Sequence, residues 1–435
     1  VKFDIIIPVY VNQCPYYTFT SHGVHMHPPP PPTRTPEALT QEIISLVRRV
    51  NDPSMTVESF LKSPFLEGFC QNYNKPSFAQ VHELLVNMDR LAQVIYREKL
   101  IMFPSGQDLA GVEFEMKMRH QDPEEAYIRE IFTNNIGSIV LTMRKDQAAV
   151  FASLETFQLD LSFKRVSHGF HELIFAFYHE RHGKLFTLAR MYINCEKKRI
   201  YQKCFEILFK HLSQCVQREI RWKHLHRNGF IGVTVDMDGK QISGFGRYLQ
   251  SIDPADNPWQ WQLQKTVKFC EAHFMRSIKT ATGGLDPAFA SVRQRMRALL
   301  TCQSWEEYET LCVQLMERES PTVSRWAKHK RNRVIAAGLN KNITLMTQRD
   351  WNVLEETSKN VNQAAKKSYS FRKALHLLPA ILAAQKLDQQ DIDQWNTRVE
   401  RDIRHSHRST SLISQYSTHM ARGSMCTINM FWRCY

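Results

Sequence analysis

Two aspartates in the middle of the sequence have the surroundings expected of metal-binding carboxylates. Asp160 lies inside the strand-like segment 157–166, where burying an unpaired carboxylate would be costly. Asp236 directly follows a second apolar segment, 230–235. Two neighbouring carboxylates repel each other unless a divalent cation lies between them, and Mg²⁺ or Mn²⁺ held in this way activates water and stabilises in-line attack at phosphorus. The alternative is that each aspartate only ends a strand or forms a turn, a role that also fits Asp238.

Cys270 and His273 form a CxxH motif, which can supply two of the four ligands of a tetrahedral Zn²⁺ ion. The neighbouring sequence offers no obvious second pair of ligands. A packed cysteine beside a helix-capping histidine is therefore an equally good interpretation of this motif.

A second group of potential zinc ligands lies near the start of the chain. His25 and His27 form a His-x-His pair, which places two imidazoles on one side of an extended chain, and Cys14 precedes them. A solvated, histidine-rich turn before the five prolines at 28–32 is the alternative. Because the strand-like N-terminal run is already under way near Val1, we expect further residues to precede it.

The segments that would position these side chains alternate between strand and helix patterns. Three strand-like runs separated by Ser-His-Gly and Arg-His-Gly turns are typical of two hairpins, and helix, strand, helix and strand patterns follow. The seven segments are 157–166, 172–178, 185–193, 197–220, 230–235, 240–250 and 266–269. This βββ-α-β-α-β order predicts an α/β protein with a ribonuclease H-like mixed sheet. Since the fourth strand lies beside the first in that topology, Asp160 and Asp236 would be neighbours.

The rest of the sequence predicts mainly helices around this core. Apolar residues recur at helical spacing on both sides of it, and Asp122 and Pro123 followed by two glutamates predict a helix over 122–134. The expected divisions are a zinc-finger-like segment with a proline-rich spacer (1–32), a helical region (37–148), the ribonuclease H-like core (149–286), a helical insert (287–350), closing helices (351–400) and a basic, poorly ordered tail (401–435).

The charge of the chain favours an anionic partner. Its 435 residues include 57 Lys+Arg and 43 Asp+Glu, a formal net charge of +14, and 43% hydrophobic residues, which excludes disorder throughout. One cluster of basic residues in the insert is a candidate phosphate-binding surface, although a solvated helix face is the commoner role. The cluster comprises Arg325, Lys328, Lys330, Arg331 and Arg333.

Cysteine use and hydropathy predict the compartment. Ten cysteines are too few for a disulfide scaffold in a chain of this length, so we expect a reducing environment. The sequence contains no run approaching the roughly 18 apolar residues of a spanning helix, and no leader opens it. We therefore expect a soluble, intracellular protein with no membrane partner.

Within these limits, residues from about Phe132 to Ile278 resemble the catalytic domain of Mutator-like element (MULE) transposases. An aspartate followed by a small residue and phenylalanine, a second aspartate after an apolar strand, and a CxxH motif with a basic residue carry the resemblance. These landmarks are Asp160, Ser162, Phe163, Asp236, Cys270, His273, Phe274 and Arg276. The family often has an N-terminal WRKY- or FLYWCH-type zinc finger that ends in His-x-His before a proline-rich stretch, as this sequence does.

The resemblance implies a DDE transposase that cleaves DNA and joins strands at transposon ends, using Mg²⁺ or Mn²⁺. DNA would be its partner, a homodimer its assembly and the nucleus its location. Asp160 and Asp236 would be the first two acids of the triad, and zinc would bind at the CxxH and histidine-rich motifs.

The third acid is where the sequence departs from the family. Related proteins carry a pattern like Ser/Thr-x-Asn-x-x-Glu after the insert, and Gln363 stands at the glutamate position here. A neutral amide cannot neutralise a metal ion. Glu355 and Glu356 could substitute through a shift in register, and Glu309 is a further candidate, although an exposed helix face suits Glu309 better.

Three functions therefore remain open at the level of sequence. The first is a Mutator-like transposase, either active or catalytically decayed. The second is a DNA-binding or transcription-regulating protein domesticated from a transposase, which Gln363 favours and the two retained aspartates oppose. The third is a ribonuclease H-like nuclease unrelated to transposition.

Overall fold

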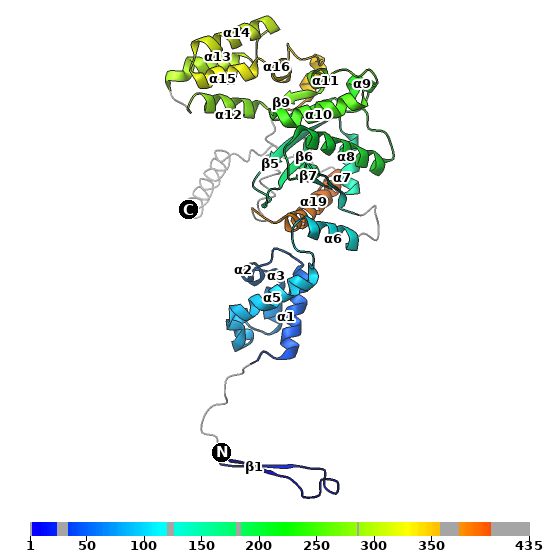
Figure 1. Cartoon of the computed structure of the whole chain (residues 1–435), viewed down its shortest axis with the longest axis vertical. Coiled ribbons are helices and arrows are strands. Elements are labelled where there is room, and N and C mark those ends of the chain that lie inside the picture. The colour runs from blue at the N-terminus through cyan, green and yellow to red at the C-terminus, as the bar shows by residue number, and fades with distance from the viewer. Residues whose placement is uncertain are drawn as a thin grey trace, which may run out of the picture. The chain divides into compact units, whose positions relative to one another are not determined.

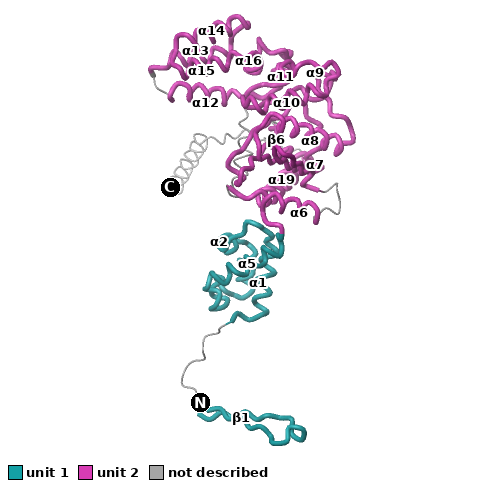
Figure 2. Tube along the Cα trace, in the orientation of Figure 1, with its two compact units in different colours: residues 1–104 teal, residues 105–435 magenta. Residues whose placement is uncertain are grey.

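The structure is a computed structural model. It describes residues 2–23, 34–119, 126–179, 184–284, 287–356 and 374–401. The chain forms two compact units, residues 1–104 and 105–435 (Figure 2). No helix in these described ranges is long and apolar enough to cross a membrane.

The first unit contains a β-hairpin and a small helical bundle. In the hairpin, Lys2 pairs with His22 and Ile6 with Thr18. The bundle buries one apolar face of each main helix, because residues such as Ile43 and Val47 recur at helical spacing and meet Ile95. The elements are β1 (Lys2–Ile6), β2 (Thr18–His22), α1 (Glu37–Val50), α2 (Val57–Leu61), α3 (Pro64–Asn72), α4 (Phe78–Val81), η1 (Glu83–Val86) and α5 (Met88–Met102).

A mixed sheet of seven strands organises the second unit (Figure 1). The strands are β3 (Ile128–Thr133), β4 (Ser138–Thr142), β5 (Thr156–Ser162), β6 (His171–His179), β7 (Lys184–Ile193), β8 (Gly232–Val235) and β9 (Val267–Phe269). Their order across the sheet is β3-β4-β7-β6-β5-β8-β9. Strands β5, β6 and β7 form two antiparallel hairpins, whereas β8 is parallel to both β5 and β9. The predicted mixed α/β class is therefore confirmed.

Strands β3 and β4 lie within the region 37–148 that the sequence predicted to be helical, so that prediction is wrong for both. Residues 128–133, inside the expected helix 122–134, form strand β3, so that prediction is wrong over this stretch; residues 122–125 lie outside the described ranges. Strand β3 forms here in place of a helix, and in the sheet its side chains make hydrogen bonds and ion pairs with other segments. Arg129 Nε donates to the Met143 carbonyl at 2.6 Å, and Glu130 accepts from Lys210 and contacts His211. The acidic residues before the strand imitated a helix N-terminus.

Helices cover both faces of the sheet (Figure 1). On one face α7 (Lys145–Ser153), α8 (Lys198–Val216) and α10 (Gly239–Ile252) enclose the main apolar core, and α6 (Leu109–Arg119) and α19 (Leu377–Glu400) pack together near β7. Phe157, Phe209, Trp222 and Phe230 pack ring against ring in that core. The remaining helices of the second unit before β9 are α9 (Lys223–His226) and α11 (Trp259–Thr266).

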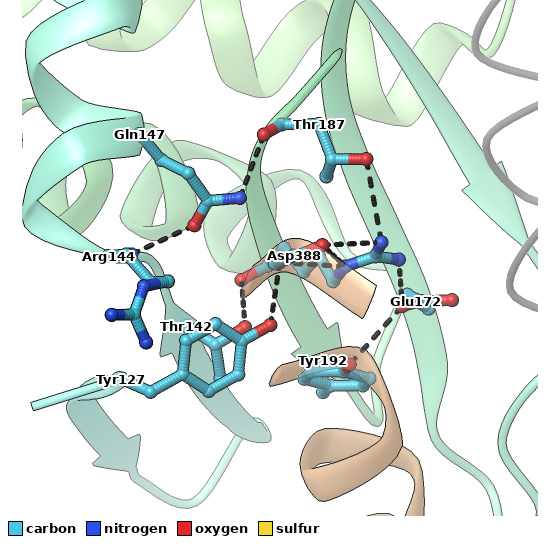
Figure 3. Close-up of polar contacts among 9 residues, drawn as sticks. Tyr127, Thr142, Arg144, Gln147, Glu172, Thr187, Tyr192 and Asp388 are labelled. Carbon is cyan, nitrogen blue, oxygen red and sulfur yellow. Dashed lines mark hydrogen bonds and ion pairs between the residues drawn. The ribbon is translucent and has the colours of Figure 1, made fainter. Parts of the chain in front are cut away.

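Helix α19 is fixed to the sheet by a buried ionic network (Figure 3). The Arg190 guanidinium on β7 donates to Asp388 at 2.8 Å and to Glu172 at 2.8 Å, and Tyr127 donates to Asp388 at 2.8 Å. The Tyr192 hydroxyl also donates to Glu172. Because the three charged groups are almost completely buried, the arrangement holds only while every partner is present.

A helical layer follows β9. Its elements are α12 (Glu271–Ala281), η2 (Pro287–Phe289), α13 (Ala290–Ala298), α14 (Trp305–Arg318), α15 (Pro321–Lys330), α16 (Arg333–Leu339) and α17 (Gln348–Val353). Gly338 of α16 lies against the Phe269 ring, so closely that a Cβ at this position would be 2.4 Å from the ring. Helix α16 thereby packs directly on the end of β9.

Candidate active site

The sheet topology brings Asp160 and Asp236 to equivalent places on adjacent strands. Gln158 of β5 pairs with Thr234 of β8 in the parallel ladder. Asp160 and Asp236 each follow one of these paired residues by two positions, so both side chains belong to the same face, with Asp160 inside β5 and Asp236 directly after β8. Both aspartates are half-buried, and the charge of Asp236 acts on Asp160.

Burial and mutual repulsion change the ionisation of this pair. Desolvation, followed by the charge of Asp236, raises the pKa of Asp160 to about 6. The pKa of Asp236 is raised as well, mainly by desolvation. His273 opposes both shifts through its positive charge. A divalent cation between the carboxylates would relieve the same repulsion more completely, and hard carboxylate oxygens suit Mg²⁺ or Mn²⁺.

His273 interacts with both aspartates, and zinc binding at the CxxH motif stays a prediction. A hydrogen bond with Cys270 raises the pKa of His273, and the charges of Asp160 and Asp236 raise it further against the opposing effect of burial. Cys270 is completely buried and precedes α12, which begins at Glu271. The CxxH motif thus joins a packed cysteine to a histidine that faces the aspartates.

An open pocket of about 610 Å³ adjoins the pair. Its lining includes Asp236, His273, Lys198 and Lys240. The Asp238 carboxylate accepts from the backbone N–H groups of Lys240 and Gln241, so it caps α10. Carboxylates beside lysines can hold a cation and the phosphate group that the cation binds.

The backbone of residues 354–356 crosses the same end of the sheet. Thr234 Oγ1 donates to the Glu355 carbonyl at 2.9 Å, and the Glu271 N–H donates to the Glu356 carbonyl at 2.9 Å. Glu356 is close enough to raise the pKa of Glu271. Glu356 therefore lies beside Glu271 at the N-terminus of α12, and Glu271 precedes His273 by two residues in the sequence.

Glu309, a further candidate for the third acid, lies in the helical layer. Glu309 on α14 accepts from both Arg331 Nε and Arg331 Nη2, at 2.9 Å and 2.7 Å, and this ion pair satisfies its carboxylate within the helical layer. Gln363 lies outside the described residues.

The basic cluster of the insert divides into exposed and buried members. Arg325 and Lys328 are exposed on α15, and Arg333 stacks on Trp305 at 4.4 Å. Lys330 contradicts the expectation of a solvated face, because only 3% of it is exposed. Its Nζ lies 3.0 Å from Met237 Sδ and 5.5 Å from the centre of the Trp326 ring, and burial lowers its pKa to about 8.

The predicted N-terminal zinc ligands are described only in part. Cys14 is exposed in the segment between β1 and β2, whereas His25 and His27 lie outside the described residues. A grouping of these three side chains therefore stays a prediction.

Sequence reasoning missed a different set of metal-type ligands. Asp108, His168 and His376 each offer one ligand atom within 4.8 Å of the others, so this triad could hold a metal ion of a kind that the donors alone do not identify. Asp108 precedes α6, His168 lies in the loop after β5 and His376 precedes α19. No spacing in the sequence signals the triad, because its members come from three distant segments.

Comparison with known proteins gives no family for this chain. No protein-family model matches the chain, and no curated protein matches it.

Proposed function

We propose that this chain is a DNA transposase of the Mutator-like class, built on a ribonuclease H-like sheet. The placement of Asp160 within β5 and of Asp236 directly after the adjacent parallel strand β8, each two residues beyond a paired residue, is the observation that carries the proposal. The order β7-β6-β5-β8-β9 within the seven-stranded sheet, with β5, β6 and β7 antiparallel and β8 parallel to β5 and β9, supports the proposal; β4 and β3 extend the sheet beyond β7.

The chemistry would be metal-dependent cleavage and transfer of DNA strands. Asp160 and Asp236 would hold Mg²⁺ or Mn²⁺, and such ions supply a nucleophilic water and neutralise charge at phosphorus. Glu356 is the third acid that the local geometry favours, since its backbone is tied to the start of α12. His273 would hold the carboxylates in their charged form. Lys198 and Lys240 would attract the phosphate backbone to the pocket.

The same proposal assigns the remaining partners. DNA accounts for the net charge of +14 and for the exposed basic residues of α15. A transposase that acts on chromosomal DNA would work in the nucleus. A homodimer would bring the two transposon ends together. Zinc at Cys14, His25 and His27 would belong to an N-terminal DNA-binding finger.

A second function is favoured by one feature of the sequence. Gln363 stands where the family carries its third acid, as expected of a domesticated DNA-binding or transcription-regulating protein that no longer cleaves DNA. In that case the positively charged surface would still bind DNA, while Asp160 and Asp236 would no longer take part in cleavage.

A cleavage assay on labelled terminal-repeat DNA with Mg²⁺ or Mn²⁺ separates these functions. The transposase proposal expects cleavage by the wild type and none by Asp160→Asn or Asp236→Asn. Asp146→Asn is the matched control, because Asp146 is an exposed aspartate in the first turn of α7. No cleavage by the wild type, with cleavage gained in Gln363→Glu, identifies a decayed enzyme. DNA binding with no cleavage by either protein favours the domesticated regulator.

A further inference from the structure

The cluster of Asp108, His168 and His376 lies at a junction of three chain segments. The His376 Nδ1 and the Asp108 Oδ1 are 3.0 Å apart, and the imidazoles of His168 and His376 stack with centroids 4.1 Å apart and planes inclined by 21°. Stacked imidazoles place their ring nitrogens side by side. The three side chains are exposed or half-buried, so an ion can reach them from solvent.

Backbone hydrogen bonds hold the three segments together independently of these side chains. The Leu375 N–H donates to the Arg165 carbonyl at 3.1 Å, and the Ser167 N–H donates to the Leu375 carbonyl at 2.8 Å. On the third side, the Leu378 N–H donates to the Gln107 carbonyl at 2.8 Å. The ligand atoms therefore lie on a preformed frame, which reduces the entropy lost when an ion binds.

His168 has a left-handed backbone conformation. Its φ of +57° is in the left-handed region, which costs free energy for a residue with a side chain and is often found at functional positions. The Ser167 hydroxyl lies 2.7 Å from His168 Nδ1 and fixes the orientation of the ring. An oxygen partner on one ring nitrogen, with the other nitrogen facing a metal, is the usual arrangement of metal-binding histidines.

We propose that Asp108, His168 and His376 form a Zn²⁺ site that clips α6, the loop after β5 and the start of α19 together. Two imidazoles and a carboxylate are ligands that zinc prefers, and a water molecule would complete four-coordination. Figure 1 shows α6 and α19 side by side, at the positions that the ion would link. The site is independent of the proposed transposase activity, because it contains neither Asp160 nor Asp236.

Zinc titration of the EDTA-treated full chain, followed by calorimetry and metal analysis, tests this proposal. Because other cysteines and histidines in the chain are also potential zinc ligands, the informative quantity is the difference between wild type and variants. We expect His168→Ala to lose one equivalent of zinc. Asp108→Asn keeps the shape of the exposed Asp108 side chain and should lower the affinity for the zinc ion at this site by about 10-fold or more. Circular dichroism confirms that each variant is folded.

An exchange of ligand type separates metal binding from ring packing. His376→Cys supplies another zinc ligand and should retain the equivalent, with Co²⁺ substitution giving thiolate-to-metal absorption, whereas His376→Ala should lose it. The zinc-loaded wild type should also melt at a higher temperature than the zinc-free protein, and His168→Ala should not. Equal zinc stoichiometry and affinity in the wild type, folded His168→Ala and folded Asp108→Asn would overturn the proposal.

Discussion

Asp236 raises the pKa of Asp160 across the parallel junction of β5 and β8. The two carboxylates reach this arrangement because Gln158 and Thr234, two residues earlier, are directly paired. A repulsive pair of acids at the end of a sheet is unfavourable by itself and favourable once a cation binds.

Metal affinity at this pair should increase with pH. The pKa of Asp160 is about 6, so its carboxyl group is largely protonated at pH 5 and largely ionised at pH 7. Since only the ionised form binds metal well, Mn²⁺ should bind more tightly at pH 7 than at pH 5, with the transition near pH 6. Calorimetry across this range measures the change. An affinity that is constant through pH 6 would contradict it.

Without metal, the same aspartate should make the fold less stable as pH rises. Its pKa is about 6 in the folded state and 3.8 for an unperturbed aspartate, so the folded state holds the extra proton between these values. The contribution of Asp160 to the free energy of unfolding is therefore at its maximum below about pH 4, and it is lost as the pH rises through 6.

Asp160→Asn tests this sign. In EDTA at pH 7 the variant should be more stable than wild type by an amount on the order of 2 kcal/mol, and the difference should vanish near pH 3.5. Urea unfolding at both pH values gives the comparison. Excess Mg²⁺ should stabilise the wild type and leave the variant unchanged. A variant that is less stable than wild type at pH 7 in EDTA would refute the account.

The buried ionic network should contribute strongly to the stability of the second unit. Asp388→Asn leaves Arg190 with Glu172 as its charged partner in Figure 3, and we expect a loss of about 3 kcal/mol. Glu309→Gln is the control, since it breaks the more exposed pair with Arg331 and should cost less than about 1 kcal/mol. Similar losses in both variants, measured by urea unfolding, would show that burial does not decide the effect.

DNA binding should distinguish the lysines of α15. Lys328→Gln removes an exposed charge and should reduce the slope of log affinity against log salt by about 1. Lys330→Gln should leave the slope unchanged, because the Lys330 ammonium is buried against Met237 and Trp326. Fluorescence anisotropy with a labelled duplex at several salt concentrations measures both. An equal change of slope in the two variants would place Lys330 on the binding surface.

The central strands could be predicted because their signals are local. Alternating apolar residues and glycine turns mark β5, β6 and β7, and the apolar run before Asp236 marks β8. The burial of Lys330 also had a signal that was missed, since Val323, Ala327 and Lys330 share one helical face.

Other features depend on contacts between distant segments. Strand β3 forms where acidic residues suggested a helix, because pairing with β4 outweighs local preference. The ligands Asp108, His168 and His376 share no motif, and backbone hydrogen bonds of Leu375 to the loop after β5 and of Leu378 to Gln107 bring their segments together.

Mn²⁺ binding measured by electron paramagnetic resonance tests the central claim most directly. Free Mn²⁺ gives a strong signal that is lost on binding, so the method counts occupied sites without requiring catalysis or a known DNA sequence. At pH 7.5 the wild type and Asp146→Asn should bind Mn²⁺ equally, and Asp160→Asn and Asp236→Asn should each lose the same binding. Unchanged Mn²⁺ binding in both of these last variants would contradict the claim that Asp160 and Asp236 form a metal site.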